Sequence, residues 1–238
     1  MPILKTFSRA WSGWRSQFLD ILFPPRCVGC HKMNVWLCDD CLEQIPRVNP
    51  PFCTRCGNPV TAGSLCVRCQ TAPMQIEHIR SAVYFGGALR QAVHQFKYQG
   101  CTALAKPLSK LMVESWRQDP MSVDLVVPVP LHTTRLRERG YNQAALLAQE
   151  MARQVELTID EQTLVRQRAT SPQVELNAKQ RKQNVSNAFQ CSSDGLAGAR
   201  VLLVDDVCTT GATLEACTMA LHTGGVRSVQ SLTLARAR

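Results

Sequence analysis

The apolar residues from His78 onward follow two patterns that alternate along the chain. Short continuous apolar runs are typical of strands covered on both faces, and longer stretches with apolar residues three or four positions apart are typical of helices. Short stretches rich in apolar residues predict strands at 78–85, 123–130, 162–166, 200–206 and 228–235, and the run 201–204 has no polar residue. The helical patterns cover 87–100, 103–117, 142–156 and 212–225. Strands alternating with helices predict an α/β fold, a parallel sheet with helices on both faces and right-handed crossovers.

The residues before this region show different patterns. Apolar residues recur at helical spacing within residues 1–23, which predicts an N-terminal amphipathic helix. It either docks on the folded body or, given two tryptophans beside basic residues, lies at a membrane interface. Residues 24–72 open with two prolines and contain few long apolar runs. We therefore divide the chain into 1–23, a small cysteine-rich domain at 24–72, and a main domain at 73–238, in which the polar stretch 169–184 is predicted to be a mobile loop.

The cysteines of residues 24–72 indicate metal binding. The chain has twelve cysteines, and eight of them form four Cys-x-x-Cys pairs, whose spacing lets both thiolates face one ion. The pairs are Cys27/Cys30, Cys38/Cys41, Cys53/Cys56 and Cys66/Cys69. Pairing in sequence gives two structural Zn²⁺ sites of four thiolates each, although interleaved pairing is also compatible with the spacing. No ligand position is left open, which argues against catalytic zinc.

Composition and charge narrow the classes of partner. The chain has no apolar run of 18 residues and no signal-peptide pattern, so we expect a cytoplasmic protein, with the inner face of the membrane as an alternative location for its N-terminal helix. The formal net charge of +9 falls to roughly +5 once two zinc sites of net charge about −2 are counted. A basic balance favours a polyanionic partner, and zinc ribbons often present basic and aromatic side chains to nucleic acid. Here these are Arg26, Lys32, Trp36, Arg47, Arg55 and Arg68.

The stretch VLLVDDVCTTGAT, residues 201–213, has the features of an anion site. An apolar strand ends in Asp205 and Asp206, and a hydroxyl-rich turn leads into a helix. Amide groups at a helix N-terminus attract an anion, and Gly211 lets the backbone approach it closely. No lysine follows Gly211, so this is not the loop of nucleotide triphosphatases. Two carboxylates beside a phosphate suit a ribose 5-phosphate, whose hydroxyls donate to the acids while the phosphate occupies the turn.

The same stretch resembles the phosphoribosyl pyrophosphate (PRPP) motif of type I phosphoribosyltransferases. VVPVPLHTTRLRERGYNQA (126–144), RQRATSPQVELNAKQRKQNVSNAF (166–189) and the cysteine-rich region resemble the ComF family of competence-associated proteins, to which the GntX proteins belong. The resemblance covers almost the whole chain. It implies a double zinc ribbon followed by a type I phosphoribosyltransferase-like sheet.

The resemblance also implies roles for individual residues. The residues expected to bind PRPP are Asp205, Asp206, Thr209, Thr210, Gly211, Ala212 and Thr213. A pyrophosphate loop at 128–140 and a flexible loop at 166–182 supply further candidates, which are Arg135, Arg139, Arg166, Arg168, Gln173 and Arg181. Mg²⁺ is expected to accompany PRPP.

The resemblance leaves the reaction open. No catalytic residue and no nucleobase pocket is recognisable, and Thr209 stands where purine-salvage relatives place an aspartate. The first hypothesis is a protein that binds PRPP or ribose 5-phosphate and handles imported single-stranded DNA, directly or with DNA-processing partners, in competence or in the use of DNA as a nutrient. The second is a phosphoribosyltransferase acting on an unidentified base or amine. The third is a PRPP-sensing regulator.

Overall fold

The computed structural model describes residues 24–168, 187–192 and 194–237. The helix predicted over 1–23 and the loop predicted over 169–184, with Gln173 and Arg181, lie outside the described residues. None of the described helices is both long and apolar enough to span a bilayer.

The main sheet has five strands, and every pairing between them is parallel. In spatial order the strands are β1 (His78–Tyr84), β7 (Ser228–Arg236), β6 (Arg200–Cys208), β2 (Leu125–Pro128) and β3 (Thr158–Ile159). The parallel sheet predicted from the alternating patterns is confirmed. β6 occupies the centre, so the acidic stretch at its carboxyl end lies at the edge of the sheet where ligands of α/β proteins bind.

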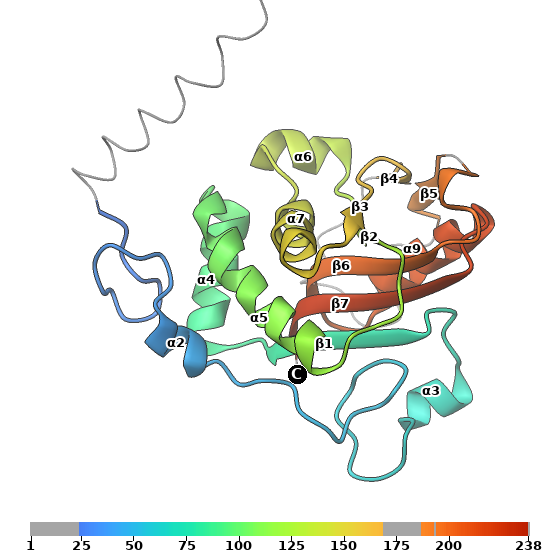
Figure 1. Ribbon diagram of the computed structural model, residues 1–238, viewed down its shortest axis with the longest axis horizontal. Helices are drawn as coiled ribbons and strands as arrows, with labels where there is room; N and C mark the ends of the chain where they lie inside the picture. Colours follow the sequence, from blue (N-terminus) through green and yellow to red (C-terminus); the bar gives the residue numbers. More distant parts are fainter. Residues whose placement is uncertain (1–23, 169–186, 193, 238) are drawn as a thin grey trace, which may run out of the picture.

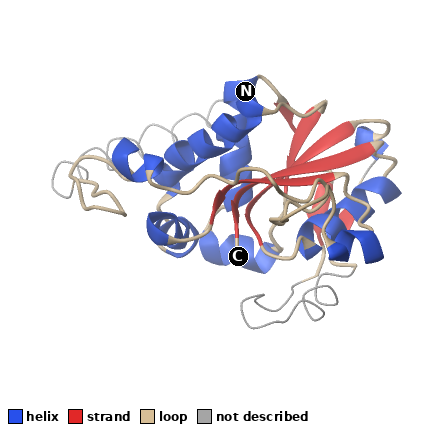
Figure 2. Ribbon diagram, turned by 90° about the horizontal axis from the view of Figure 1, so that it is seen from below, coloured by secondary structure: helices blue, strands red, loops and turns tan. Residues whose placement is uncertain are grey.

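Helices cover both faces of this sheet, as expected (Figure 2). One face packs against α4 (Gly87–Tyr98), α5 (Ala105–Gln118, preceded by a 3₁₀ turn at Thr102–Leu104) and α7 (Gln143–Val155). The other face packs against α9 (Ala212–Thr223). Along β6 the side chains alternate, so Leu202 and Val204 join the first core and Val201 and Leu203 join the second.

Several short elements differ from the sequence-based expectation. The strand predicted at 162–166 is β4 (Leu164–Arg166), which pairs antiparallel with β5 (Phe189–Cys191) in a separate small sheet. A three-residue strand that pairs with a returning segment needs no crossover helix, which explains why it stands outside the parallel order. The segment expected to be a pyrophosphate loop contains a helix, α6 (Thr133–Arg139). A further 3₁₀ turn (Asp194–Leu196) precedes β6.

The cysteine-rich region forms two ribbons that dock at different places (Figure 1). The first ribbon carries α2 (Asp39–Glu43), lies beside α4 and α5, and shares its apolar residues with the core of the main domain. The second ribbon carries α3 (Val67–Thr71) and lies below β1. The Ile79 amide of β1 donates to the Arg55 carbonyl of this ribbon at 2.7 Å.

Candidate functional site

The eight paired cysteines gather into two groups of four in sequence order. Within each group the four Sγ atoms lie within 4.8 Å of one another. The groups are Cys27, Cys30, Cys38 and Cys41, and Cys53, Cys56, Cys66 and Cys69. The sequential pairing is therefore the one that the fold adopts.

The chemistry of both groups fits zinc. Burial works to raise the pKa of Cys27, but the backbone N–H groups of Cys38, Cys30 and Gly29 outweigh it and lower the pKa to about 6. Cys53 has the same balance, and backbone N–H groups of the second ribbon lower its pKa to about 6. Burial raises the pKa of Cys41 and Cys69. Thiolates held by backbone amides in a compact set of four are the ligands of a structural Zn²⁺ site.

The carboxyl end of β6 and the start of α9 form the loop predicted to hold a phosphate. We call residues 209–213 the phosphate loop. Gly211 is the residue before α9, and its φ of +78° is accessible to glycine at little cost. A Cβ at this position would lie 2.8 Å from Ile79 Cδ1, so β1 packs directly against the turn. Arg68 of the second ribbon donates to the Thr210 carbonyl at 2.9 Å.

Asp205 and Asp206 meet different neighbours, because consecutive residues of a strand face opposite sides of the sheet. Asp206 is 4% exposed, and its Oδ2 lies 2.6 Å from Lys97 Nζ of α4. Its Oδ1 accepts from the Val207 amide at 2.6 Å. Asp205 Oδ1 accepts from the Asp206 amide at 2.8 Å. Both oxygens of Asp206 are thus engaged within the protein.

The electrostatics of the two acids follow from this arrangement. Loss of solvent, followed by the negative charge of Asp206, raises the pKa of Asp205 to about 7, although Lys97 and Arg166 oppose the rise. For Lys97, burial alone would lower the pKa, but the charge of Asp206 reverses the direction and the pKa is raised. Lys97 therefore stays charged beside Asp206, whereas Asp205 titrates near neutral pH.

The predicted arginines approach this site from two sides. Burial lowers the pKa of Arg166, and the nearby charge of Asp205 opposes the shift, so the two residues are electrostatic neighbours. Arg135 and Arg139 of α6 line a cavity of about 270 Å³ together with Lys97. Arg139 also lies over the Tyr98 ring, 5.6 Å from its centroid. Arg168 is exposed at the end of a described segment.

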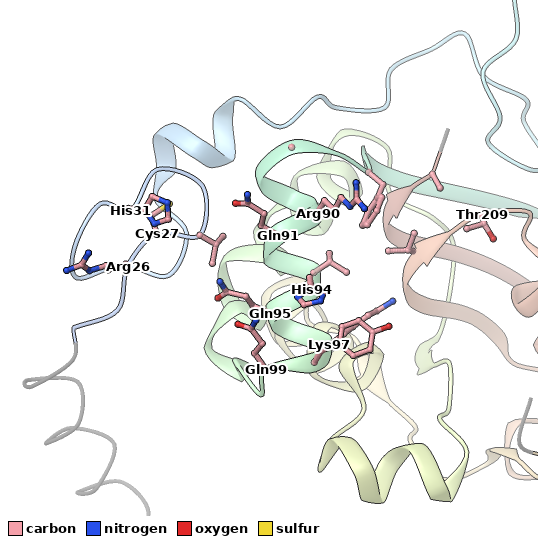
Figure 3. A pocket seen from close by; sticks show the side chains of 17 residues that line it. Arg26, Cys27, His31, Arg90, Gln91, His94, Gln95, Lys97, Gln99 and Thr209 are labelled. Carbon is pink, nitrogen blue, oxygen red and sulfur yellow. The ribbon is translucent and has the colours of Figure 1, made fainter. Parts of the chain in front are cut away.

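A larger cavity of about 1180 Å³ lies along α4, between the first ribbon and the phosphate loop. Figure 3 shows Gln91, Gln95 and Gln99 on the side of α4 that faces the first ribbon. Arg90, His94 and Lys97 extend on the side of Thr209 (Figure 3). Arg26 and His31 of the first ribbon add to the polar lining, and none of the described residues that line the cavity is acidic. We call this cavity the α4 cleft.

Sequence reasoning named Arg26 of the cleft but missed Lys97 and the other cleft residues of α4. The apolar stripe of Leu89, Val93 and Phe96 marks the buried face of α4, and Lys97 lies at its edge. A cation at the edge of a buried stripe needs an anionic partner, which was the available signal. The Asn142 side chain accepts from the Ala144 amide at 3.0 Å and caps α7. Cys208 is buried, and burial raises the pKa of its thiol.

Comparison with known proteins gives matches over both parts of the chain. The double zinc ribbon domain model matches residues 18–70, and the phosphoribosyl transferase domain model matches residues 139–238. The DNA utilization protein YhgH of Salmonella typhimurium is 33% identical over 206 residues, which cover 84% of this chain and 90% of that protein. Competence protein F of Haemophilus influenzae is 32% identical over 224 residues, covering 89% of this chain and 97% of that protein.

Among solved structures, the glutamine PRPP amidotransferase from B. subtilis, complexed with ADP and GMP, matches at 17% identity and a TM-score of 0.39. The match covers 55% of this chain and 26% of that enzyme.

Proposed function

Because the chain belongs to the family of the DNA utilization protein YhgH and competence protein F, we propose that it binds PRPP or ribose 5-phosphate at the phosphate loop and handles single-stranded DNA in the α4 cleft. The observation that carries the proposal is the placement of Asp205 near the carboxyl end of β6, four positions before a loop whose amides open a 12-residue helix, α9. Helix amides and the helix dipole favour a phosphate at that end.

In the proposed complex the two acids have different roles. Asp205 accepts the ribose hydroxyls, since its Oδ2 has no hydrogen-bond donor among the described residues. Asp206 binds the ribose hydroxyls only when Lys97 is displaced, because contacts within the protein already engage both of its carboxylate oxygens. Arg135, Arg139 and Arg166 supply positive charge for the pyrophosphate of PRPP, and Mg²⁺ enters with that ligand as a further counter-charge.

Isothermal titration calorimetry with the zinc-loaded full chain tests sugar-phosphate binding. Ribose 5-phosphate is expected to bind, ribose is not, and Asp205→Asn is expected to weaken binding at least about tenfold, because a charge-assisted hydrogen bond contributes about 1.5–3 kcal/mol. Asp124→Asn is the matched control, since Asp124 pairs with Arg200 outside the loop. The proposal fails if ribose 5-phosphate produces no saturable heat, or if both variants bind as the wild type does.

The lining of the α4 cleft supports the single-stranded DNA part of the proposal. Arg26 and Arg90 provide positive charge for phosphates, and Gln91, Gln95 and Gln99 offer both donors and acceptors to base edges. Phe85 and Tyr98 also line the cleft and can stack on bases. An unpaired strand exposes both its phosphates and its base edges, whereas a duplex hides the edges.

The salt dependence of binding tests this assignment. In the variant R26Q/R90Q, the slope of log K against log salt concentration for an oligonucleotide should fall by about 1.4, at about 0.7 per lost phosphate contact on a single strand. Arg227→Gln is the control, because Arg227 is exposed and does not line the cleft. An unchanged slope in R26Q/R90Q, or an equal fall in the control, would remove the cleft from the proposal.

One observation favours the second candidate, a phosphoribosyltransferase. The α4 cleft extends to Thr209 of the phosphate loop, so a base or amine in the cleft would lie beside a sugar bound there. Release of pyrophosphate from PRPP and Mg²⁺, screened against nucleobases and ammonia, separates the candidates. Turnover that Asp205→Asn abolishes supports the transferase, and binding without pyrophosphate release supports the first proposal.

A further inference from the structure

Arg236, near the carboxyl end of the chain, has its charge buried with few partners. Its side chain belongs to the last residue of β7 and is 2% exposed. Nη1 donates to Cys208 Sγ at 3.7 Å, whereas Nε and Nη2 are buried without a hydrogen-bond acceptor among the described residues. No carboxylate of the described segments forms an ion pair with it. A buried guanidinium is stable only beside an anion.

The second ribbon lies beside this guanidinium. A Cβ built at Gly57 of that ribbon would lie only 3.1 Å from Nη2 of Arg236. Gly57 directly follows Cys56, a member of the second group of four cysteines. Four thiolates around one Zn²⁺ carry a net charge of about −2, and these cysteines are mostly buried, so their charge reaches Arg236 through protein rather than water.

The same guanidinium also contacts the base of the phosphate loop. Cys208, the acceptor from Nη1, is the residue immediately before Thr209. On the other side of the loop, Arg68 of the second ribbon donates to the Thr210 carbonyl. Gly57 has φ +68°, and a Cβ there would lie 2.3 Å from the Ile79 carbonyl, so this turn packs tightly against β1. Two arginines therefore join the second ribbon to the loop.

We infer that Arg236 is the counter-charge of the second four-thiolate zinc site and that, together with Arg68, it is a positioning residue coupling this site to the phosphate loop. Only the phosphate-loop half of the inference rests on the proposed function. The coupling is reciprocal by linkage: an anion held in the loop slows loss of the second zinc, and loss of that zinc weakens anion binding. The first ribbon has no part in it.

Zinc release from the full chain, followed with a chromogenic chelator, tests the inference without any sugar phosphate. In Arg236→Met, one of the two zinc ions should leave about 10–100-fold faster, because loss of a residue that supports metal ligands typically lowers metal affinity by about that factor. The other ion should leave at the wild-type rate. In Arg236→Lys, which keeps the charge and loses the planar guanidinium, the zinc release rate should lie between those of Arg236→Met and the wild type. This variant is expected to fold even if Arg236→Met does not.

Arg47→Met is the matched control. Arg47 anchors the first ribbon to α5 through Glu114, with Nη2 at 2.9 Å from the carboxylate, so this arginine supports the other ribbon and not the second zinc site. Equal release rates in Arg236→Met, Arg236→Lys and the wild type would overturn the inference, as would equal acceleration of both ions. A second experiment measures binding of ribose 5-phosphate by calorimetry. Arg236→Met and Arg68→Gln should each weaken this binding. If the wild type binds none, the proposed function fails while the zinc arm still decides the role of Arg236.

Discussion

The ion pair between Lys97 and Asp206 should contribute measurably to stability, and Lys97→Met is the perturbation that exposes this contribution. Asp206 has a side chain that is 5% exposed, and that of Lys97 is 21% exposed, with 2.6 Å between Nζ and Oδ2. Removal of one partner of a buried pair leaves an uncompensated charge and costs about 3–5 kcal/mol. We expect about 3 kcal/mol for Lys97→Met, the lower end, because the Val207 amide still donates to Asp206.

The double variant separates the pair from its surroundings. Asp206→Asn should cost less than Lys97→Met, about 2 kcal/mol, because the partly exposed ammonium of Lys97 can turn toward water. With both charges removed, no buried charge is left, so K97M/D206N should be more stable than the sum of the single changes by about 2–3 kcal/mol.

Urea unfolding of the zinc-loaded protein, followed by tryptophan fluorescence, measures this coupling. Trp116 of α5 is buried at 9% exposure and reports on the core beside α4. With a slope of about 2 kcal/mol per molar urea, a loss of 3 kcal/mol moves the midpoint by about 1.5 M. Additivity of the single changes to within about 0.5 kcal/mol would refute the argument, because independent sites behave in that way.

Three further predictions concern the loop, the pH dependence and the metals. Gly211→Ala should destabilise the protein more than Gly63→Ala, as measured by thermal melts. Both glycines have φ +78°, so backbone strain should cost each variant about 1–2 kcal/mol. Only Gly211→Ala adds a clash, because a Cβ there meets Ile79 Cδ1 at 2.8 Å, whereas one at Gly63 meets nothing within 4 Å. Folding raises the pKa of Asp205 from 3.8 to about 7. Between about pH 4 and pH 7 the folded chain therefore keeps a proton that the unfolded chain has lost. This residue should make the free energy of unfolding fall as pH rises through that window, by up to about 1.4 kcal/mol per pH unit. Urea unfolding of Asp205→Asn across that window should lack this part of the slope, and a slope equal to that of the wild type would contradict the assignment. Chelation of both zinc ions should lower the thermal midpoint of the full chain, because zinc binding and ribbon folding are linked, and readdition of Zn²⁺ should restore it.

The fold was predictable because its signals are local and repeated. β6 contains the continuous apolar run 201–204, β1 and β7 are rich in apolar residues, and the helices between the strands carry apolar residues at helical spacing, so the order of the main elements follows from the sequence. The two cysteine groups were predictable for the same reason, because each Cys-x-x-Cys pair is recognisable within four consecutive residues. The short elements β3, β5 and α6 carry too few residues for either pattern, and α6 has no buried residue at all.

The parts of the candidate site that escaped prediction depend on contacts between distant residues. Lys97 lies 109 positions before Asp206 in the chain, and nothing near either residue specifies the other. Arg236 ends an apolar strand, where a single arginine has no local explanation. The opposite orientation of Asp205 and Asp206 is different, because it follows from the period of two in a strand and was accessible from the predicted strand at 200–206, which contains both residues.

The two ribbons are attached by different physical means, and this difference predicts different consequences for each zinc. The first ribbon contributes Leu37, Leu42 and Ile45 to the main core, so unfolding it exposes apolar surface of the domain itself. The second ribbon has a small core made mainly of its own cysteines, and it reaches the domain through polar contacts such as that of Arg68 with the phosphate loop. Apolar burial scales with area and supports global stability, whereas directional polar contacts fix the position of the groups they join. Loss of the first zinc should therefore lower the free energy of unfolding most, and loss of the second should lower anion affinity most.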